Sequence, residues 1–166
     1  MTHPAAFVQL IGELQLTANA AAKAKAEKQQ LTIKRNDLCG QALGAGIKMA
    51  ALARLSGISR AMLYKLNPAP TVPAGGESTE TLRARLEDTA ERLRAADHEL
   101  AMNITRRGQI LRTISVHFPN ALAVKEIAGF SGLSYDRARR YMEDDTIKPD
   151  HIPAEIDVQI DAAEGH

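Results

Sequence analysis

Apolar side chains recur every three or four positions over most of the chain, which is the spacing of one face of an α-helix. Between residues 5 and 30 this spacing runs from Phe7 to Leu14 and then gives way to an alanine-rich stretch with interspersed lysines. Alanine and lysine are good helix formers. We therefore predict one long helix there, with a weaker second half, and Asn36 and Asp37 either interrupt it or cap a further helix.

A second amphipathic stretch begins after Ser78 and Thr79, which are suitable N-cap residues. Its apolar stripe consists of Leu82, Leu86, Leu93, Leu100 and Ile104. The stripe is partly heptad-like, so it either packs within the chain or forms a homodimer through residues 80–105. We favour a monomer, because the threonine, alanine and asparagine between these positions are poor occupants of a coiled-coil seam. Arg106-Arg107-Gly108 interrupts the pattern, which then resumes and ends at Pro119-Asn120.

The most informative feature is a repeat. Met49-Ala-Ala-Leu-Ala-Arg-Leu-Ser-Gly-Ile-Ser-Arg recurs 75 positions further on as Val124-Lys-Glu-Ile-Ala-Gly-Phe-Ser-Gly-Leu-Ser-Tyr. Each copy has a small residue where two short helices would cross, a glycine for the turn, an apolar residue that enters the core and a serine that caps the next helix. These residues are Ala53, Gly57, Ile58 and Ser59 in the first copy, and Ala128, Gly132, Leu133 and Ser134 in the second.

After each turn the helical spacing separates an inward face from an outward one. The inward residues are Leu63, Leu66, Ala138 and Tyr141, and the outward face is free to enter a DNA groove. The predicted DNA-binding residues are Lys48, Ser59, Arg60, Ala61, Tyr64 and Lys65 with the first copy, and Lys125, Ser134, Tyr135, Arg137, Arg139 and Arg140 with the second. Asp136 shares the outward face of the second copy and would repel phosphate. The second copy therefore either reads DNA bases or serves only as a packing module.

This pattern resembles the helix-turn-helix of bacterial and phage transcription regulators, over about 20 residues in each copy. The resemblance implies two DNA-binding units and double-stranded DNA as the partner. The whole-chain layout has a long N-terminal helix, a first motif, a linker helix and a second motif. It is similar to that of immunity repressors of temperate actinobacterial phages, which implies a transcriptional repressor.

Residues 67–79 contain three of the seven prolines and two adjacent glycines, a composition that resists both helix and strand. We therefore predict an all-α fold, with two small helix-turn-helix domains joined by a Pro/Gly linker and a long helix. The predicted parts are an N-terminal helical domain (1–67), the linker (68–79), a long helix with the second domain (80–145) and a flexible acidic tail (146–166). Alternating apolar residues at 156, 158 and 160 leave an edge strand or wing as a second interpretation of the tail.

The net charge of +1 conceals an uneven distribution. Residues 1–66 contain nine bases and three acids, and residues 118–141 contain four bases and two acids. The last 25 residues, 142–166, contain one base and eight acids. Basic charge therefore gathers around the two copies of the motif, as phosphate binding requires.

Other classes of function find little support in the sequence. The five histidines have no metal-ligand spacing, and no nucleophile elbow or phosphate loop is present, so we expect neither an enzyme nor a cofactor or metal. The single cysteine, Cys39, is expected to be a buried small residue. With no apolar run long enough to span a membrane and no signal peptide, a cytoplasmic protein is expected. The alternative to a repressor is a DNA-binding adaptor for phage packaging or segregation that self-assembles through its long helix.

Overall fold

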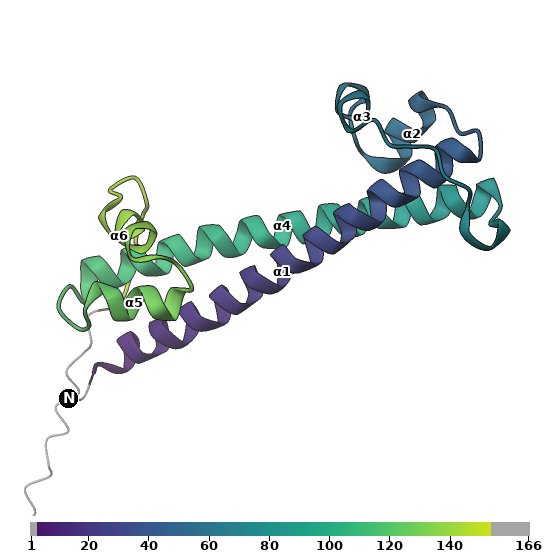
Figure 1. Ribbon diagram of the computed structural model, residues 1–166. Coiled ribbons are helices and arrows are strands. Elements are labelled where there is room, and N and C mark those ends of the chain that lie inside the picture. Colours follow the sequence, from purple (N-terminus) through teal and green to yellow (C-terminus); the bar gives the residue numbers. More distant parts are fainter. Residues whose placement is uncertain (1–2, 154–166) are drawn as a thin grey trace, which may run out of the picture. The chain divides into compact units, whose positions relative to one another are not determined.

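The computed structural model describes residues 3–153, and in this range the chain forms only helices (Figure 1). The predicted all-α class is confirmed. The elements are α1 (Ala5–Gly44), α2 (Met49–Ser56), α3 (Arg60–Leu66), the short 3-10 helix η1 (Ala74–Gly76), α4 (Thr79–His117), α5 (Val124–Ser131) and α6 (Tyr135–Glu143). No helix among residues 3–153 combines the length and the apolar character that crossing a membrane requires.

The chain divides into two compact units, and each contains part of α1 and part of α4. Unit 1 comprises Met1–Ala20 and Asn103–His166, and unit 2 comprises Ala21–Met102. Both have the same construction: the C-terminal part of one long helix, the two short helices that follow it, and the N-terminal part of the other long helix. The arrangement of helices is therefore repeated as well, and this structural repeat includes parts of the long helices. The predicted division into 1–67 and 80–145 differs from this one, because the boundaries between the two units fall inside the long helices, between residues 20 and 21 of α1 and between residues 102 and 103 of α4.

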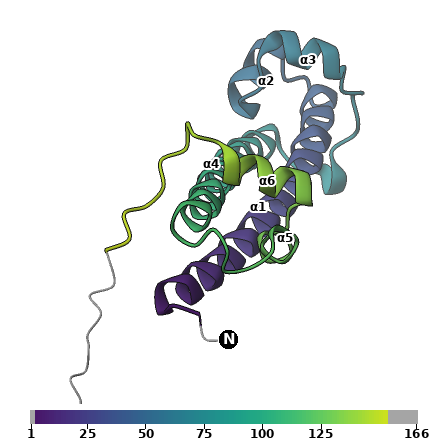
Figure 2. The ribbon, with the colours of Figure 1, turned by 90° about the vertical axis from the view of Figure 1, so that its left-hand side faces the viewer.

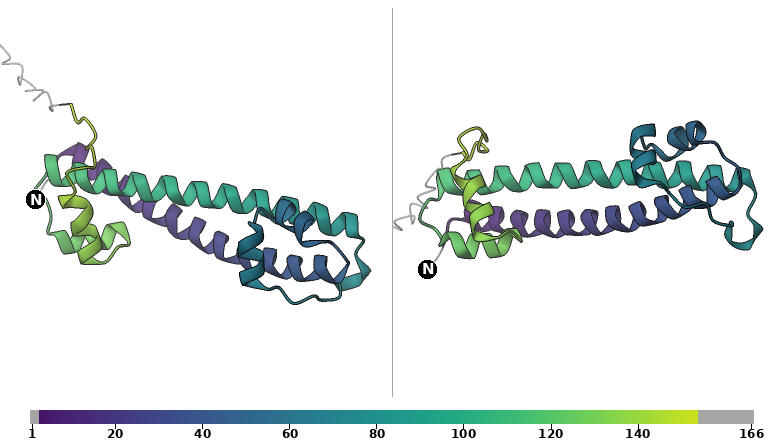
Figure 3. Two further views of the ribbon diagram at one scale, coloured as in Figure 1. Left: turned by 90° about the horizontal axis from the view of Figure 1, so that it is seen from above. Right: turned by 45° about the horizontal axis from the view of Figure 1, so that its top comes forward.

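In unit 2, α1 and α4 run antiparallel and the short helices α2 and α3 pack beside them (Figure 3). The core consists of Leu38, Cys39, Ala42, Ile47, Leu52, Leu55, Ile58, Leu63, Leu82 and Leu86. Further along, Leu31 packs with Leu93 and Ala96, and Lys28 Nζ lies 2.5 Å from Asp97 Oδ1. Leu82, Leu86 and Leu93 of the α4 stripe are thus buried against α1 within the chain, whereas Leu100 and Ile104 are only partly buried. Asn36 and Asp37 do not interrupt α1, and Asp37 accepts a hydrogen bond from Gln41 Nε2 at 2.9 Å.

The predicted linker lies inside unit 2 and packs against α1. The backbone N–H of Thr71 donates to the carbonyl oxygen of Gly40 at 3.0 Å. A Cβ atom at Gly40 would lie 2.7 Å from the carbonyl oxygen of Ala69, and one at Gly44 would overlap the carbonyl of Thr71. Two glycines one helical turn apart therefore let this segment cross directly over the backbone of α1. The segment connects α3 to α4 and does not separate the two units.

Unit 1 has its own core, and Figure 2 shows the ribbon with α5 and α6 of this unit towards the viewer. The core consists of Phe7, Leu10, Leu14, Ile110, Leu111, Ile114, Ile127 and Met142. The predicted interruption at Gly108 is absent, since α4 continues through it. A Cβ atom at Gly108 would lie 2.8 Å from Cδ1 of Tyr141, so the glycine instead makes room for the ring that α6 places against α4.

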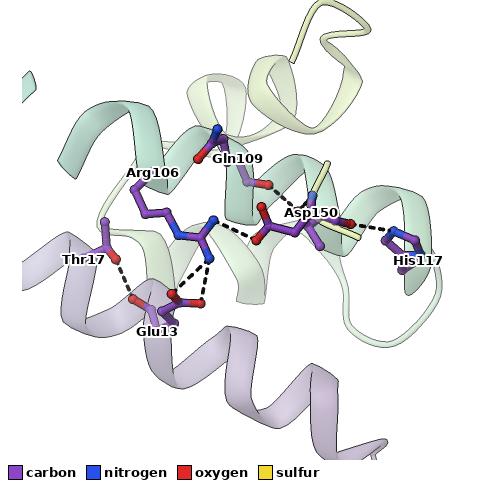
Figure 4. A network of polar contacts seen from close by, with 7 residues as sticks. Glu13, Thr17, Arg106, Gln109, His117 and Asp150 are labelled. Atoms are coloured by element: carbon purple, nitrogen blue, oxygen red, sulfur yellow. Dashed lines mark hydrogen bonds and ion pairs between the residues drawn. The ribbon is translucent and has the colours of Figure 1, made fainter. Parts of the chain in front are cut away.

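Residues 144–153 form a C-terminal strap along unit 1, part of which Figure 4 shows. Arg106 donates to Asp150 Oδ2 at 2.7 Å and to both carboxylate oxygens of Glu13 at 3.0 Å. The backbone N–H of Asp150 donates to Thr113 Oγ1 at 2.9 Å, and Ile152 packs against the core. Residues 146–153 of the predicted flexible tail thus contact unit 1 through the Arg106–Asp150 ion pair, the hydrogen bond to Thr113 and the packing of Ile152. The predicted strand or wing at 156–160 lies outside the described residues.

Candidate nucleic-acid interface

The first helix pair, α2 and α3, has the predicted turn. Gly57 ends α2 in the left-handed conformation, with φ 70° and ψ 12°, which a glycine adopts without steric cost. The hydroxyl oxygen of Ser59 then accepts a hydrogen bond from the backbone N–H of Met62 at 3.2 Å and caps α3. Ile58 and Leu63 are buried, as predicted. Leu66 was predicted to face inward but is 43% exposed, because α3 ends there.

The second helix pair, α5 and α6, repeats this geometry. Gly132 has φ 66° and ψ 16°, and the hydroxyl of Ser134 accepts from the backbone N–H of Arg137 at 3.4 Å. Ala128 and Ala138 are buried, and Tyr141 packs partly buried against the core of unit 1. The glycine turns and serine caps predicted for both copies are therefore confirmed. Sequence reasoning missed Met142, which α6 buries in the same core.

All twelve predicted DNA-binding residues are exposed. On α3, residues four apart share a face, so Arg60 lies beside Tyr64 and Ala61 beside Lys65, away from the buried Leu63. Tyr64 is 67% exposed, and α3 also exposes Met62 (49%), which the sequence analysis did not select. The structure thus brings four of the predicted residues together on one short, solvent-facing helix.

The first helix pair carries an unopposed positive charge. Residues 45–66 contain Lys48, Arg54, Arg60 and Lys65 and no acidic residue. None of these four side chains forms an ion pair with another residue of the described range. Arg94 of α4 approaches the turn as well, since a Cβ atom on Gly57 would lie 3.5 Å from its Nη1. Nothing in the sequence distinguished Arg94 from the other polar positions of α4.

The second helix pair has a mixed surface. Arg139 Nε lies 2.7 Å from Glu143 Oε1, and the hydrogen bond to that carboxylate raises the pKa of the Arg139 guanidinium. Asp136 lies one turn from Arg139 and Arg140 on the same exposed face. At the start of α5, Glu126 accepts a hydrogen bond from the backbone N–H of Ala123 at 3.1 Å. Acidic side chains thus offset much of the basic charge that the sequence predicted here.

Cys39 and a cavity beside it lie next to the first helix pair. A cavity of about 220 Å³ lies between α1, α3 and the segment that follows α3. Cys39 lines it but is only 1% exposed, and burial raises the pKa of its thiol. Within residues 3–153, no three histidine, cysteine, aspartate or glutamate side chains gather as metal ligands would.

Comparison with protein families, with curated proteins and with solved structures finds no match for this chain. The candidate interface therefore rests on the two helix pairs themselves. Of the two, the first presents the stronger combination of an exposed second helix and unpaired basic side chains.

Proposed function

We propose that the chain is a sequence-specific, double-stranded DNA-binding transcriptional repressor that uses α2–α3 and α5–α6 as two helix-turn-helix units. The single observation that carries this proposal is the outward face of α3. It exposes Arg60, Tyr64 and Lys65 on a helix pair that has four bases and no acid. An exposed helix with this charge has the size and the chemistry to enter the major groove of B-DNA.

The side chains of α3 divide into two kinds of contact. Arg60 stands at the first position of the helix, where an arginine can donate two hydrogen bonds to O6 and N7 of a guanine. Ala61 is small enough for the helix to approach the base edges closely. Lys65, one turn further along, suits a phosphate. The ring and the hydroxyl group of Tyr64 suit contact with either a base or a phosphate.

A structural role alone explains this face poorly. Met62 and Tyr64 leave about half or more of their surface exposed, although burying either would stabilise the fold. The absence of acids from residues 45–66 makes a polyanion the best-matched partner.

A self-assembling DNA adaptor is the less favoured alternative. Assembly through the long helix would need an apolar stripe on the surface, but Leu82, Leu86 and Leu93 of α4 are buried against α1. The similarity of the layout to phage immunity repressors favours repression as the outcome of DNA binding.

A promoter assay tests the repressor proposal. A duplex selected by the full chain from random DNA is placed over a promoter that drives a reporter, and the same bases in scrambled order serve as the control. We expect the full chain to lower expression from the selected duplex only. Equal expression from both promoters in cells that contain the protein would refute repression, and increased expression from the selected duplex would indicate an activator.

A further inference from the structure

Three arginines of α4 lie in unit 1, and they differ in what they bind. Arg106 contacts the carboxylates of Glu13 and Asp150. Arg112 donates to the carbonyl oxygen of Met142 at 2.8 Å and lies 2.6 Å from Asp145 Oδ1. Both guanidinium groups are therefore neutralised inside the unit.

Arg107 has no carboxylate partner in the described range. Its Nη1 donates a long hydrogen bond, 3.4 Å, to the carbonyl oxygen of Ser131 at the end of α5. Its Nε is buried and has no hydrogen-bond partner among the described residues. A guanidinium group has five N–H donors, so one contact with a helix end leaves most of its capacity unused.

Arg137 stands at the other end of the same turn. Ser131 ends α5, Ser134 caps α6 through the backbone N–H of Arg137, and the exposed side chain of Arg137 forms no ion pair with a described residue. Burial lowers the pKa of the Arg107 guanidinium, Tyr141 opposes this effect, and the like charge of Arg137 lowers the pKa further. Arg107 and Arg137 thus border the same turn between α5 and α6, and neither forms an ion pair with a described residue.

An anion with several oxygens would satisfy this arrangement. A phosphate accepts paired hydrogen bonds from guanidinium groups, and its charge would relieve the repulsion between the two arginines. The partner that the proposed function supplies is the DNA backbone. The outward face of α6, in contrast, carries Arg139 and Arg140 together with Asp136 and Glu143, so acids offset its basic charge.

We propose that Arg107 and Arg137 bind one phosphate of the DNA backbone, so that the second helix pair holds the duplex without reading its sequence. This inference rests on the proposed function and assigns a separate task to one of its two units. The first helix pair then supplies the sequence preference, and the second adds affinity that is independent of sequence.

The test measures how the affinity of the full chain for DNA depends on salt. Wild type, Arg107→Gln and Arg137→Gln are titrated with a selected duplex and with a random-sequence duplex over a range of NaCl concentrations. Arg139→Gln is the matched control, because it removes the same charge from the same helix but from an arginine paired with Glu143. Thermal unfolding of each variant shows whether the fold is intact.

We expect each of the two variants to lower the slope of log K against log salt by about 1, since one phosphate contact is lost. The affinity should fall by the same factor for both duplexes. The double variant should lose no more slope than either single variant, because both arginines serve one phosphate. Arg139→Gln should change the slope by less than half as much.

Three results would overturn the proposal. An unchanged slope in Arg137→Gln, whose side chain is exposed, would remove the phosphate site while leaving the proposed function intact. A loss confined to the selected duplex would make Arg137 a base-reading residue. A wild-type chain with no salt-dependent affinity for either duplex would refute both the phosphate site and the proposed function.

Discussion

At the scale of single residues, local chemistry determines much of the two helix pairs. A glycine in the left-handed conformation and a serine cap act over a few residues, so Gly57, Ser59, Gly132 and Ser134 could be predicted from the sequence. The exposure of Leu66 could not, because it depends on where α3 ends and on what packs against it. The same limit applies to Arg107, whose role depends on a neighbour from another helix.

Arg60→Ala tests base reading by α3. Because Arg60 is exposed at the start of α3, we expect its loss to cost about 1 to 3 kcal/mol of binding free energy for the selected duplex and to relax one position of the site. Binding to random duplex should change much less. Arg54→Ala, which removes an exposed arginine from α2, should leave the ratio of the two affinities unchanged. If Arg60→Ala weakens binding to both duplexes equally, Arg60 contacts phosphate instead.

Cys39 should be chemically inert in the folded chain. Burial raises the pKa of its thiol, so the reactive thiolate is scarcer at neutral pH than in an exposed cysteine. We expect a thiol reagent to modify folded protein far more slowly than protein unfolded in denaturant. A raised pKa also means that its contribution to stability is present below the usual thiol range and is lost as the pH rises through the folded value. Equal modification rates in the folded and unfolded states would contradict the burial of Cys39.

At the scale of elements, periodicity predicted the helices well but misplaced their interruptions. A glycine inside a helical pattern indicates a break when only propensity is considered. Gly108 instead lies where the ring of Tyr141 approaches the backbone of α4, and Gly40 lies where the segment after α3 crosses α1. Close packing between elements far apart in the sequence leaves no local signal beyond the glycine itself.

The contact between Gly108 and Tyr141 can be tested by one added methyl group. Gly12→Ala, also inside a long helix of unit 1, has nothing within 4 Å of the new Cβ and should stabilise the fold by about 1 kcal/mol. Gly108→Ala should be less stable than Gly12→Ala by about 1 to 3 kcal/mol, because its Cβ overlaps the tyrosine ring. Denaturant unfolding measures both. In a chain that also carries Tyr141→Ala, Gly108→Ala should raise the free energy of unfolding. If Gly108→Ala still lowers it in that chain, the tyrosine ring is not the cause of the destabilisation.

The C-terminal strap should contribute to stability, whereas the segment beyond it should affect DNA binding. Truncation after Asp145 removes Asp150 and Ile152, and we expect it to lower the free energy of unfolding by about 1 to 3 kcal/mol. Truncation after Pro153 keeps both residues and should leave the unfolding transition unchanged. It removes four acids and no lysine or arginine, so nonspecific DNA binding should become tighter. Equal stability of the two truncated chains would show that the strap contributes nothing to the fold.

At the scale of the whole molecule, the sequence predicted an all-α chain with two similar motifs but placed its parts incorrectly. The Pro/Gly segment indicated a boundary, yet Thr71 within it is bound to α1. Each compact unit contains part of both long helices, and the composition of the sequence does not show where a helix passes from one unit to the other. The sequence allowed the apolar stripe of α4 to pack either within the chain or against a second copy, and the structure shows that Leu82, Leu86 and Leu93 of this stripe are buried with residues of α1.

Selection of binding sites from random duplex DNA by the full chain, followed by hydroxyl-radical footprinting of the selected duplex, tests the central claim most directly. The exposed residues of α3 and α6 differ almost completely and only α3 is proposed to read bases, so one chain is expected to select an asymmetric site. We predict one short block of enriched bases, read by α3, inside a longer stretch of protected backbone to which the second helix pair contributes. A failure to enrich any sequence would contradict specific DNA binding. A palindrome with two equal half-sites would contradict binding by a single chain and would indicate that two chains bind together.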